Sequence, residues 1–190
     1  MTFLYAVCLS GKYNAINTHY FLYNSLFFSL LKHLMLTDLE IRKARLQDLA
    51  AILSLYEQPE IDDGVSLSLD KAAEIFSRME QYPNYALYVA EFKGQIVGSF
   101  ALLIMDNLGH LGAPSAIIED VVVDPDYHHR GIGKKMMLTA IACAADSNCY
   151  KITLSANCKR QAAHQFYESL GFEKHGYSYK ISVSREKNTK

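Results

Sequence analysis

The sequence lacks several features that would assign the chain to a special class of protein. It has no internal repeats and no low-complexity tracts, so it is neither a repeat array nor a broadly disordered chain. Its 19 basic and 20 acidic side chains nearly cancel, for a net charge of −1 at pH 7. We therefore expect no general attraction to nucleic acid or to a membrane surface, and any charge-based recognition must be local.

Cysteine is scarce and shows no functional spacing. The four cysteines contain no CxxC pair, no zinc-type ligand spacing and no disulfide framework pattern: Cys8, Cys143, Cys149 and Cys158. We therefore expect no metal site, and a reducing cytoplasm is the simplest compartment.

A long uninterrupted apolar run is also absent. The most apolar stretch, "YFLYNSLFFSLLKHLML" at 20–36, is broken by Asn24, Ser25 and Lys32. It is short for a span of about 20 apolar residues, and it has neither a basic start nor a small-residue cleavage site. These features predict no transmembrane helix.

Ordinary domain patterning begins just after Met35, at "LTDLEIRKARLQDLAAI". We therefore divide the chain into an apolar and aromatic N-terminal extension at residues 1–36, either peripheral or a mis-assigned start, and one domain at residues 37–190.

Hydrophobic periodicity within this domain predicts alternating strands and helices. Lys93-Gly94 is a tight hairpin signal, and Gly171 is a natural helix C-cap. The pattern predicts a single mixed α/β domain. The expected strands are 39–44, 85–92, 95–105, 116–123, 149–156 and 177–183, and the expected helices are 48–56, 67–82, 131–147 and 159–171.

The junction "VVVDPDYHHRGIGKK" at 121–135 combines the end of a strand with the start of a helix. Pro125 stops strand pairing, while Gly131 and Gly133 allow a tight turn. The free N–H groups at the helix start would bind phosphate, so a nucleotide-like pyrophosphate is the expected ligand. The motif is neither a Walker loop nor a dinucleotide fingerprint. Positive charge is added by Arg130, Lys134 and Lys135.

Two longer motifs, "IEDVVVDPDYHHRGIGKKMM" and "LSANCKRQAAHQFYESLGFEK", resemble those of the GNAT superfamily of acetyl-CoA-dependent N-acetyltransferases. The resemblance extends from Ile41 to Ile181, including the hairpin "VAEFKGQIVGSF", and leaves out the N-terminal extension. It implies an α/β domain whose mixed, mostly antiparallel central sheet is flanked by helices on both faces. It also implies acetyl-CoA as the co-substrate and is compatible with a homodimer.

The resemblance carries the coenzyme-binding role to particular positions. His128 stands where the family usually has Arg or Gln, and the spacing after Asn157 is slightly longer than usual. The backbone of residues 121–123 would pair with the pantetheine amides and donate an N–H to the thioester oxygen. The coenzyme-binding residues expected are Val121, Val122, Val123, His128, His129, Arg130, Gly131, Ile132, Gly133, Lys134, Asn157 and Arg160.

Acetyl transfer to an amine requires a neutral amine, a stabilised oxyanion and a proton for the departing thiolate. Tyr167 resembles the family's general acid, although its helical spacing also fits a core tyrosine. Glu119 is the candidate that removes the amine proton through water or attracts the cation, and structural pairing is its alternative role. In a regular strand Asp120 would point to the opposite face, so only one of the two carboxylates should line the cleft.

The acceptor is predicted to be the primary amine of a small molecule, reached by direct transfer through a tetrahedral intermediate. Glu57, Glu60, Asp62 and Asp63 would attract a cationic amine, or they form a solvated acidic loop. Two alternatives remain open: an acetyltransferase acting on protein N-termini or lysines, and a non-catalytic acetyl-CoA-binding regulatory module. Other polar residues are less informative: His110 as a surface histidine, and His164 and Cys158 without nucleophile geometry.

Overall fold

The computed structural model describes residues 37–59, 61 and 64–181, so the expected N-terminal extension lies outside the described residues. No helix within these ranges is long and apolar enough to cross a membrane. The strands are β1 (Leu39–Lys43), β2 (Tyr85–Phe92), β3 (Gln95–Met105), β4 (Ser115–Val123) and β5 (Lys151–Leu154); the helices are α2 (Leu49–Tyr56), α3 (Leu69–Met79), α4 (Ile132–Asp146) and α5 (Gln161–Glu168), with short 3₁₀ turns η1 (Leu46–Asp48), η2 (His110–Gly112) and η3 (Pro125–Tyr127).

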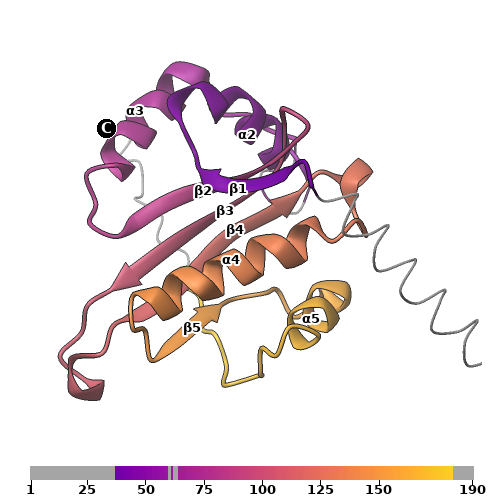
Figure 1. Cartoon of the computed structure of the whole chain (residues 1–190). Helices are drawn as coiled ribbons and strands as arrows, with labels where there is room; N and C mark the ends of the chain where they lie inside the picture. The colour runs from indigo at the N-terminus through magenta and orange to yellow at the C-terminus, as the bar shows by residue number, and fades with distance from the viewer. Residues whose placement is uncertain (1–36, 60, 62–63, 182–190) are drawn as a thin grey trace, which may run out of the picture.

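The five strands form one sheet in the order β1-β2-β3-β4-β5 (Figure 1). Pairing is antiparallel from β1 to β4 and parallel between β4 and β5. The β2–β3 hairpin turns at Lys93 and Gly94, whose φ angles of 51° and 79° suit a two-residue turn. The mixed, mostly antiparallel sheet and this hairpin confirm the prediction from sequence.

Alternating side chains of the central strands form two apolar layers. Leu87, Val89 and Ala101 pack with α2 and α3 on one face. The intervening residues, Ala90, Phe100 and Leu102, pack on the other face with α4, and the half-buried apolar side chains of α5 join this layer. Figure 1 shows α2 and α3 above the sheet and α4 and α5 below it. Helices therefore cover both faces, as expected.

Strand β4 contains a bulge, which corrects the expectation of a regular strand. Glu119 pairs with Ala101 and Val122 with Ser99, so β4 has one more residue than β3 between these pairs. The extra residue is accommodated at Asp120, whose φ of 52° is left-handed. The sequence predicts that only one of these two carboxylates lines the cleft. In the structure both Glu119 and Asp120 are exposed, so exposure does not single out one of them.

The strand expected at residues 177–183 is wrong for its described part. Residues 177–181 form no strand, and residues 182 and 183 lie outside the described ranges. The alternating pattern of this segment is real, but a strand also needs a partner, and this segment pairs with none of the five described strands.

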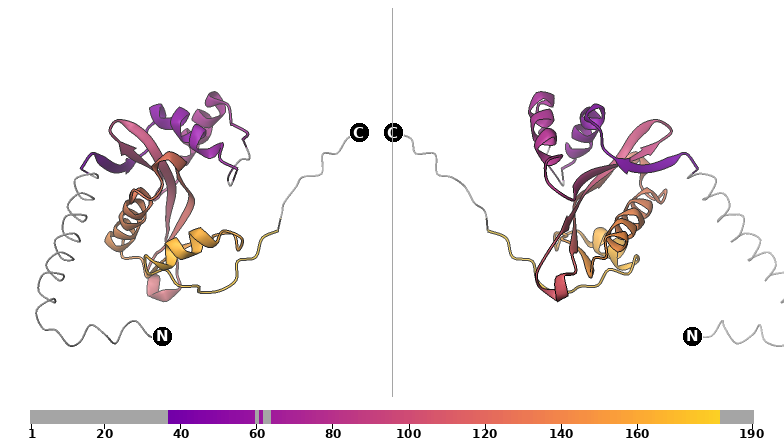
Figure 2. Two further views of the ribbon diagram at one scale, coloured as in Figure 1. Left: turned by 90° about the vertical axis from the view of Figure 1, so that its right-hand side faces the viewer. Right: turned by 60° about the vertical axis from the view of Figure 1, so that its left-hand side comes forward.

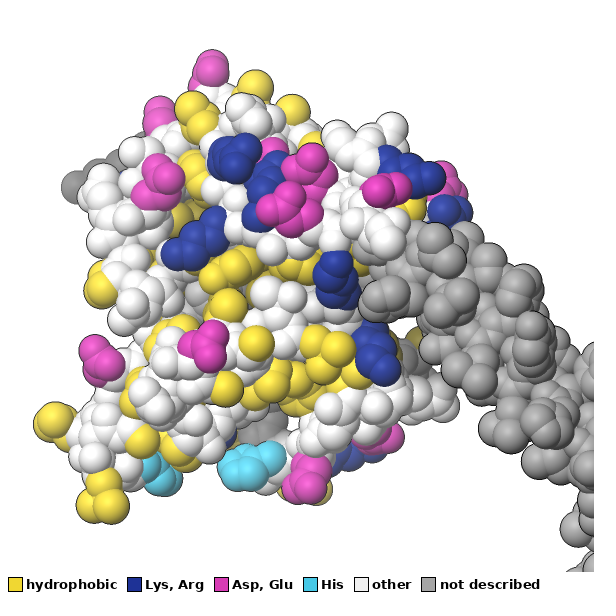
Figure 3. Space-filling view, viewed as in Figure 1, with side chains coloured by type: hydrophobic (Ala, Val, Ile, Leu, Met, Phe, Trp, Pro, Cys, Tyr) yellow, Lys and Arg dark blue, Asp and Glu magenta, His cyan; other side chains and the backbone are white. Residues whose placement is uncertain are grey.

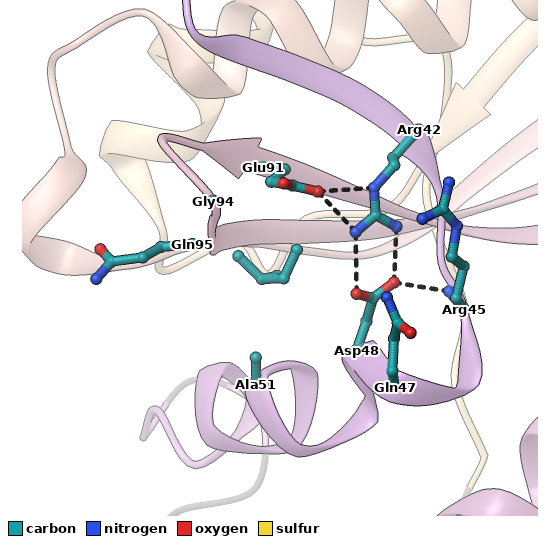
Figure 4. Close-up of a pocket in the computed structure, with 9 residues that line it drawn as sticks. Arg42, Arg45, Gln47, Asp48, Ala51, Glu91, Gly94 and Gln95 are labelled. Atoms are coloured by element: carbon teal, nitrogen blue, oxygen red, sulfur yellow. Dashed lines mark hydrogen bonds and ion pairs between the residues drawn. The ribbon is translucent and has the colours of Figure 1, made fainter.

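A buried ion-pair network joins β1, the start of α2 and β2 (Figure 4). The Arg42 guanidinium donates to Asp48 Oδ2 at 2.7 Å, to Asp48 Oδ1 at 3.0 Å and to Glu91 Oε2 at 2.8 Å. The Arg45 N–H adds a bond of 2.7 Å to Asp48. The Arg42 and Asp48 side chains are only 12% and 6% exposed, so their pairing is shielded from water and ties α2 to the sheet.

We predict that Asp48→Asn lowers the free energy of unfolding by about 3 kcal/mol, because it leaves a buried guanidinium without one of its two carboxylates. Urea denaturation measures this change. Glu74→Gln is the control, because Glu74 pairs with Lys71 on an exposed surface. It should cost less than about 0.5 kcal/mol, and equal losses in both variants would contradict the prediction.

The difference in the free energy of unfolding between wild type and Asp48→Asn should also depend on pH. The hydrogen bond from Arg42 is the main cause that lowers the pKa of Asp48 from its ordinary value. A carboxyl group whose folded pKa is depressed stabilises the protein fully above its unfolded pKa of about 3.9, and this stabilisation is lost as the pH falls through the folded value. The difference between wild type and Asp48→Asn should therefore shrink in acid.

Candidate active site

The site is built where β4 separates from β5. Their parallel pairing covers only Ser115–Ile118 of β4, ending at Ile118 and Leu154. Beyond that point β4 continues to Val123 with β3 on one side and no β5 residue in register on the other. The described part of the sheet is therefore open at this point, and an extended ligand could hydrogen-bond to the backbone of residues 121–123.

A compact turn leads from β4 into α4. Asp124 Oδ1 accepts from the Asp126 N–H at 2.9 Å, and Pro125 begins the 3₁₀ turn η3. His129 and Gly131 then adopt left-handed φ angles of 60° and 88°. Gly131 is the N-cap of the 15-residue helix α4, which places free N–H groups at the positive end of a long helix.

Gly133 allows a close approach between α4 and α5. A Cβ at this position would lie 3.3 Å from Cζ of Phe166 and 3.8 Å from Cγ2 of Val123. The end of β4, the first turn of α4 and the α5 helix therefore meet at this glycine. Ile132 anchors the turn, because its side chain is buried in the layer beneath α4.

The basic side chains around the β4–α4 turn make different contacts and form no single cluster. Arg130 lies over the Tyr127 ring, 4.8 Å from its centroid, and donates to the Asp126 carbonyl at 2.8 Å. His129 and Lys134 are exposed. Lys135, expected to add charge to the turn, instead donates to the Leu39 carbonyl of β1.

Two side chains approach the carbonyl at the end of β4. Nε2 of His128 lies 3.0 Å from the Val123 carbonyl oxygen, and Gln58 Nε2 donates to the same oxygen at 3.3 Å. Gln58 was missed from sequence, since it lies in the loop after α2 and no motif marks it. The contact joins the loop after α2 to the end of β4. The Val122 side chain is buried, while Val121 and Val123 pack partly against the layer beneath α4.

Glu119 lies on the sheet face covered by α2 and α3, in register with Ala101 and Leu87. Partial desolvation raises the pKa of Glu119, even though the residue is exposed on one side, and the neighbouring charge of Asp120 raises it further. Burial also raises the pKa of Tyr85, with additional contributions from Asp120 and Glu119. Tyr85 was not predicted as a site residue, because its position in β2 is far from Glu119 in sequence. The structure therefore brings together two carboxyl groups and a phenol.

Tyr167 lies in the apolar layer on the opposite face, with α4 and α5. Its ring packs edge-on against the ring of Phe172, and the two ring centroids are 5.9 Å apart. Burial raises its pKa, while the charge of Arg160 opposes the shift. Asn157 shapes the turn before α5: its Oδ1 accepts from the Lys159 N–H at 3.0 Å and its carbonyl from the Arg160 N–H at 2.9 Å.

The remaining expected residues lie away from this arrangement or outside the described ranges. Glu60, Asp62 and Asp63 of the acidic loop lie outside the described residues, and Glu57 is exposed. His110 is exposed and stacks on Tyr150, with ring centroids 3.9 Å apart. Nε2 of His164 lies 3.0 Å from the Asn157 carbonyl oxygen, a contact that accounts for this residue without a nucleophile role.

A separate open pocket of about 590 Å³ lies between α2, β1 and the β2–β3 hairpin (Figure 4). Its polar wall is the Arg42, Asp48 and Glu91 network, whose charges pair with one another. On the face shown in Figure 3, basic and acidic side chains are interspersed and form no patch of one sign. Neither Glu119 nor Tyr167 lines this pocket.

We predict that Asp120→Asn lowers the pKa of Glu119 toward its ordinary value, because it removes the neighbouring negative charge. Asn tolerates the left-handed backbone at this position, so the bulge should persist. Carboxyl ¹³C NMR titration of Glu119 measures the change. Asp126→Asn, in the turn after β4, is the control. An unchanged Glu119 pKa in Asp120→Asn would contradict the electrostatic coupling.

Comparison with known proteins agrees with the resemblance in sequence. The Acetyltransferase (GNAT) family profile matches residues 49–172. The chain is 32% identical over 156 residues to glucosamine 6-phosphate N-acetyltransferase of Trypanosoma brucei brucei, covering 78% of this chain and 98% of that protein. A solved acetyltransferase structure from Trypanosoma brucei aligns with a TM-score of 0.68 at 30% identity, over 77% of this chain and 100% of that chain.

The fold is shared with a more distant structure, glucosamine-6-phosphate N-acetyltransferase from Arabidopsis thaliana. That alignment has a TM-score of 0.68 at 21% identity and covers 77% of this chain and 99% of that chain. Since the family profile spans both the β4–α4 turn and α5, it includes the whole opening described above. The chain therefore belongs to the GNAT acetyltransferase family and is an acyltransferase.

Proposed function

We propose that the protein transfers the acetyl group of acetyl-CoA to the primary amine of a small molecule. The observation that supports this most is the opening between β4 and β5 beyond Ile118 and Leu154. One carboxyl group, Glu119, lies on one face of the sheet beside it, and one phenol, Tyr167, lies in the layer on the other face. A thioester held in the opening would be accessible to both groups.

The coenzyme half of the proposed site combines backbone donors with a few side chains. The N–H groups at the start of α4 would hold the pyrophosphate, a role favoured by the helix dipole and by the left-handed Gly131. Residues 121–123 would pair with the pantetheine arm through their backbone. Asn157 and Arg160 lie in the turn before α5 and would form the opposite wall.

In the proposed reaction the neutral amine nitrogen attacks the thioester carbonyl carbon and forms a tetrahedral intermediate. The C–S bond then breaks, and the thiolate takes the proton of the Tyr167 hydroxyl. The amine proton passes through water to Glu119, whose raised pKa makes it a better base than an ordinary carboxylate. A backbone N–H of β4 would stabilise the oxyanion.

The acceptor is proposed from the relatives. The Trypanosoma brucei brucei relative is named as an N-acetyltransferase of glucosamine 6-phosphate, which is a small amine. The similarity covers nearly the whole of that protein, so a small-molecule acceptor is favoured over a protein substrate. Glucosamine 6-phosphate is the first acceptor to test, beside polyamines, aminophosphonates, amino acids and N-terminal peptides.

We predict turnover with at least one small amine in an acetyl-CoA-dependent thiol-release assay. Turnover with peptides alone would overturn the small-molecule proposal, and a chain that binds acetyl-CoA without any turnover would favour a regulatory role.

Tyr167→Phe should lower kcat by about 100-fold or more while acetyl-CoA still binds, because the phenol donates its proton only as the thiolate leaves. Stopped assays give kcat, and calorimetry gives the dissociation constant. Tyr82→Phe is the control, since Tyr82 is 59% exposed and precedes β2. Full turnover by Tyr167→Phe would remove this residue from the mechanism.

Gly133→Val should weaken acetyl-CoA binding by about tenfold or more, because its side chain would push the first turn of α4 away from Phe166. Gly176→Val is the matched control, since a Cβ at Gly176 meets nothing within 4 Å. Calorimetry compares the two. Equal affinities would argue against a coenzyme site at this turn.

A further inference from the structure

The loop after α2 contributes a polar side chain to the open edge of β4. The amide nitrogen of Gln58 donates to the Val123 carbonyl at 3.3 Å. The next residue, Asp124, donates its N–H to the Val97 carbonyl of β3 at 2.9 Å. Backbone groups of successive strand residues point to opposite sides, so the Val123 carbonyl points away from β3 and toward the opening. Gln58 therefore reaches the opening itself.

The backbone around Gln58 is held in place as well. Its carbonyl accepts from the Ile61 N–H at 2.9 Å, and the Glu57 carbonyl accepts from the Gly64 N–H at 3.0 Å. Pro59 follows directly and restricts the backbone conformation of Gln58. The half-buried side chain is thus fixed at both ends, so little of its freedom would be lost when a ligand binds.

The chemistry of this contact decides which way the Gln58 amide faces. A carbonyl oxygen only accepts hydrogen bonds, so the amide group that approaches Val123 is the nitrogen and not the oxygen. The amide oxygen is bonded to the same carbon as this nitrogen, so it stays at the same edge of β4. It is an uncharged acceptor, and it has no hydrogen-bond donor among the residues that the structure describes. A ligand N–H in the opening can therefore donate to it.

Gln58 and Glu119 approach β4 from the same side of the sheet. Figure 2 shows α2 and α3 on one side and α4 on the other. Glu119 lies on the face that α2 and α3 cover, and Gln58 comes two residues after the end of α2. Along β4, Glu119 and Val123 are at most about 13 Å apart, at about 3.3 Å per residue. A ligand between the two side chains would lie level with Val121, within the backbone proposed to hold the coenzyme.

We propose that Gln58 binds and orients the acceptor amine. Its amide oxygen accepts an N–H of the neutral amine, which turns the nitrogen lone pair toward the thioester carbonyl carbon. This role rests on the proposed function and assigns a residue to the acceptor half of the same site. An uncharged acceptor suits the role, because a carboxylate at this position would favour the ammonium form, which has no lone pair for attack.

The first test replaces Gln58 with methionine, which keeps the length of the side chain and removes both polar groups. Gln58→Met should lower kcat/KM for the amine that wild type acetylates best by about tenfold, a loss typical of one hydrogen bond. Calorimetry should give a dissociation constant for acetyl-CoA within about twofold of wild type. Gln47→Met is the control, since Gln47 is exposed and lines the separate pocket beside Arg42. It should match wild type in both measurements.

The outcomes of this test separate the role of Gln58 from the proposed function. An unchanged kcat/KM in Gln58→Met, or a loss that the acetyl-CoA affinity shares equally, would overturn only the role of Gln58. Absence of turnover by wild type with every amine in the panel would overturn the proposed function and this role together.

The second test distinguishes orientation of the amine from support of the loop. Gln58→Glu should move the pH profile of kcat at saturating amine to higher pH, because the new carboxylate favours the ammonium form of the bound amine. Glu119 and His128 also titrate, but they are present in both proteins, so the shift is measured against wild type. Gln47→Glu is the control and should leave the profile unchanged. A Gln58→Glu profile that matches wild type would overturn the proposal.

Discussion

The rest of the proposed site depends on one constraint, the point at which β4 and β5 stop pairing. Their register ends at Ile118 and Leu154, and the bulge at Asp120 follows almost at once. A bulge increases the local twist and redirects a strand, and β5 itself ends at Leu154, so the described strands have no common register beyond this point. Beyond Ile118, Val122 and Val123 still pair with β3 but have no β5 partner within the described residues, and Glu119 lies at the start of this opening.

Desolvation shifts the pKa values of the two proposed proton-transfer residues beside this opening. Burial is the main cause that raises the pKa of Glu119 and of Tyr167, although they belong to different layers. A raised pKa makes the carboxyl group a better base, and it keeps the phenol protonated until a strong acceptor such as a thiolate appears. Desolvation raises both pKa values because each group carries its charge in the deprotonated form, and this one effect is compatible with the two opposite proton transfers proposed for Glu119 and Tyr167.

Much of the fold could be predicted because it depends on local pattern. The alternation in "YALYVAEF", the Lys93-Gly94 turn and the Gly131-Ile132-Gly133 helix start each need only their own neighbours. The bulge at Asp120 and the contact from Gln58 to Val123 depend on strands and loops distant in sequence, so they were missed. The grouping of Tyr85 with Glu119 was missed for the same reason. The strand expected at 177–183 was wrong for a related reason. An alternating pattern can predict a strand, but it cannot specify the partner strand that the segment needs.

The contrast between Asp48 and Glu119 distinguishes a structural carboxylate from the one proposed to accept a proton. Both are acidic side chains near the α2 side of the sheet, but their pKa values shift in opposite directions. Asp48 receives hydrogen bonds from Arg42 and Arg45, which stabilise its charged form and leave it unsuited to accept a proton. Glu119 has a second acid as its neighbour and is partly desolvated, so protonation relieves an unfavourable charge. The open pocket beside Arg42 is therefore walled by charges that pair with one another, and the proposed proton transfer is assigned instead to Glu119 at the bulge of β4.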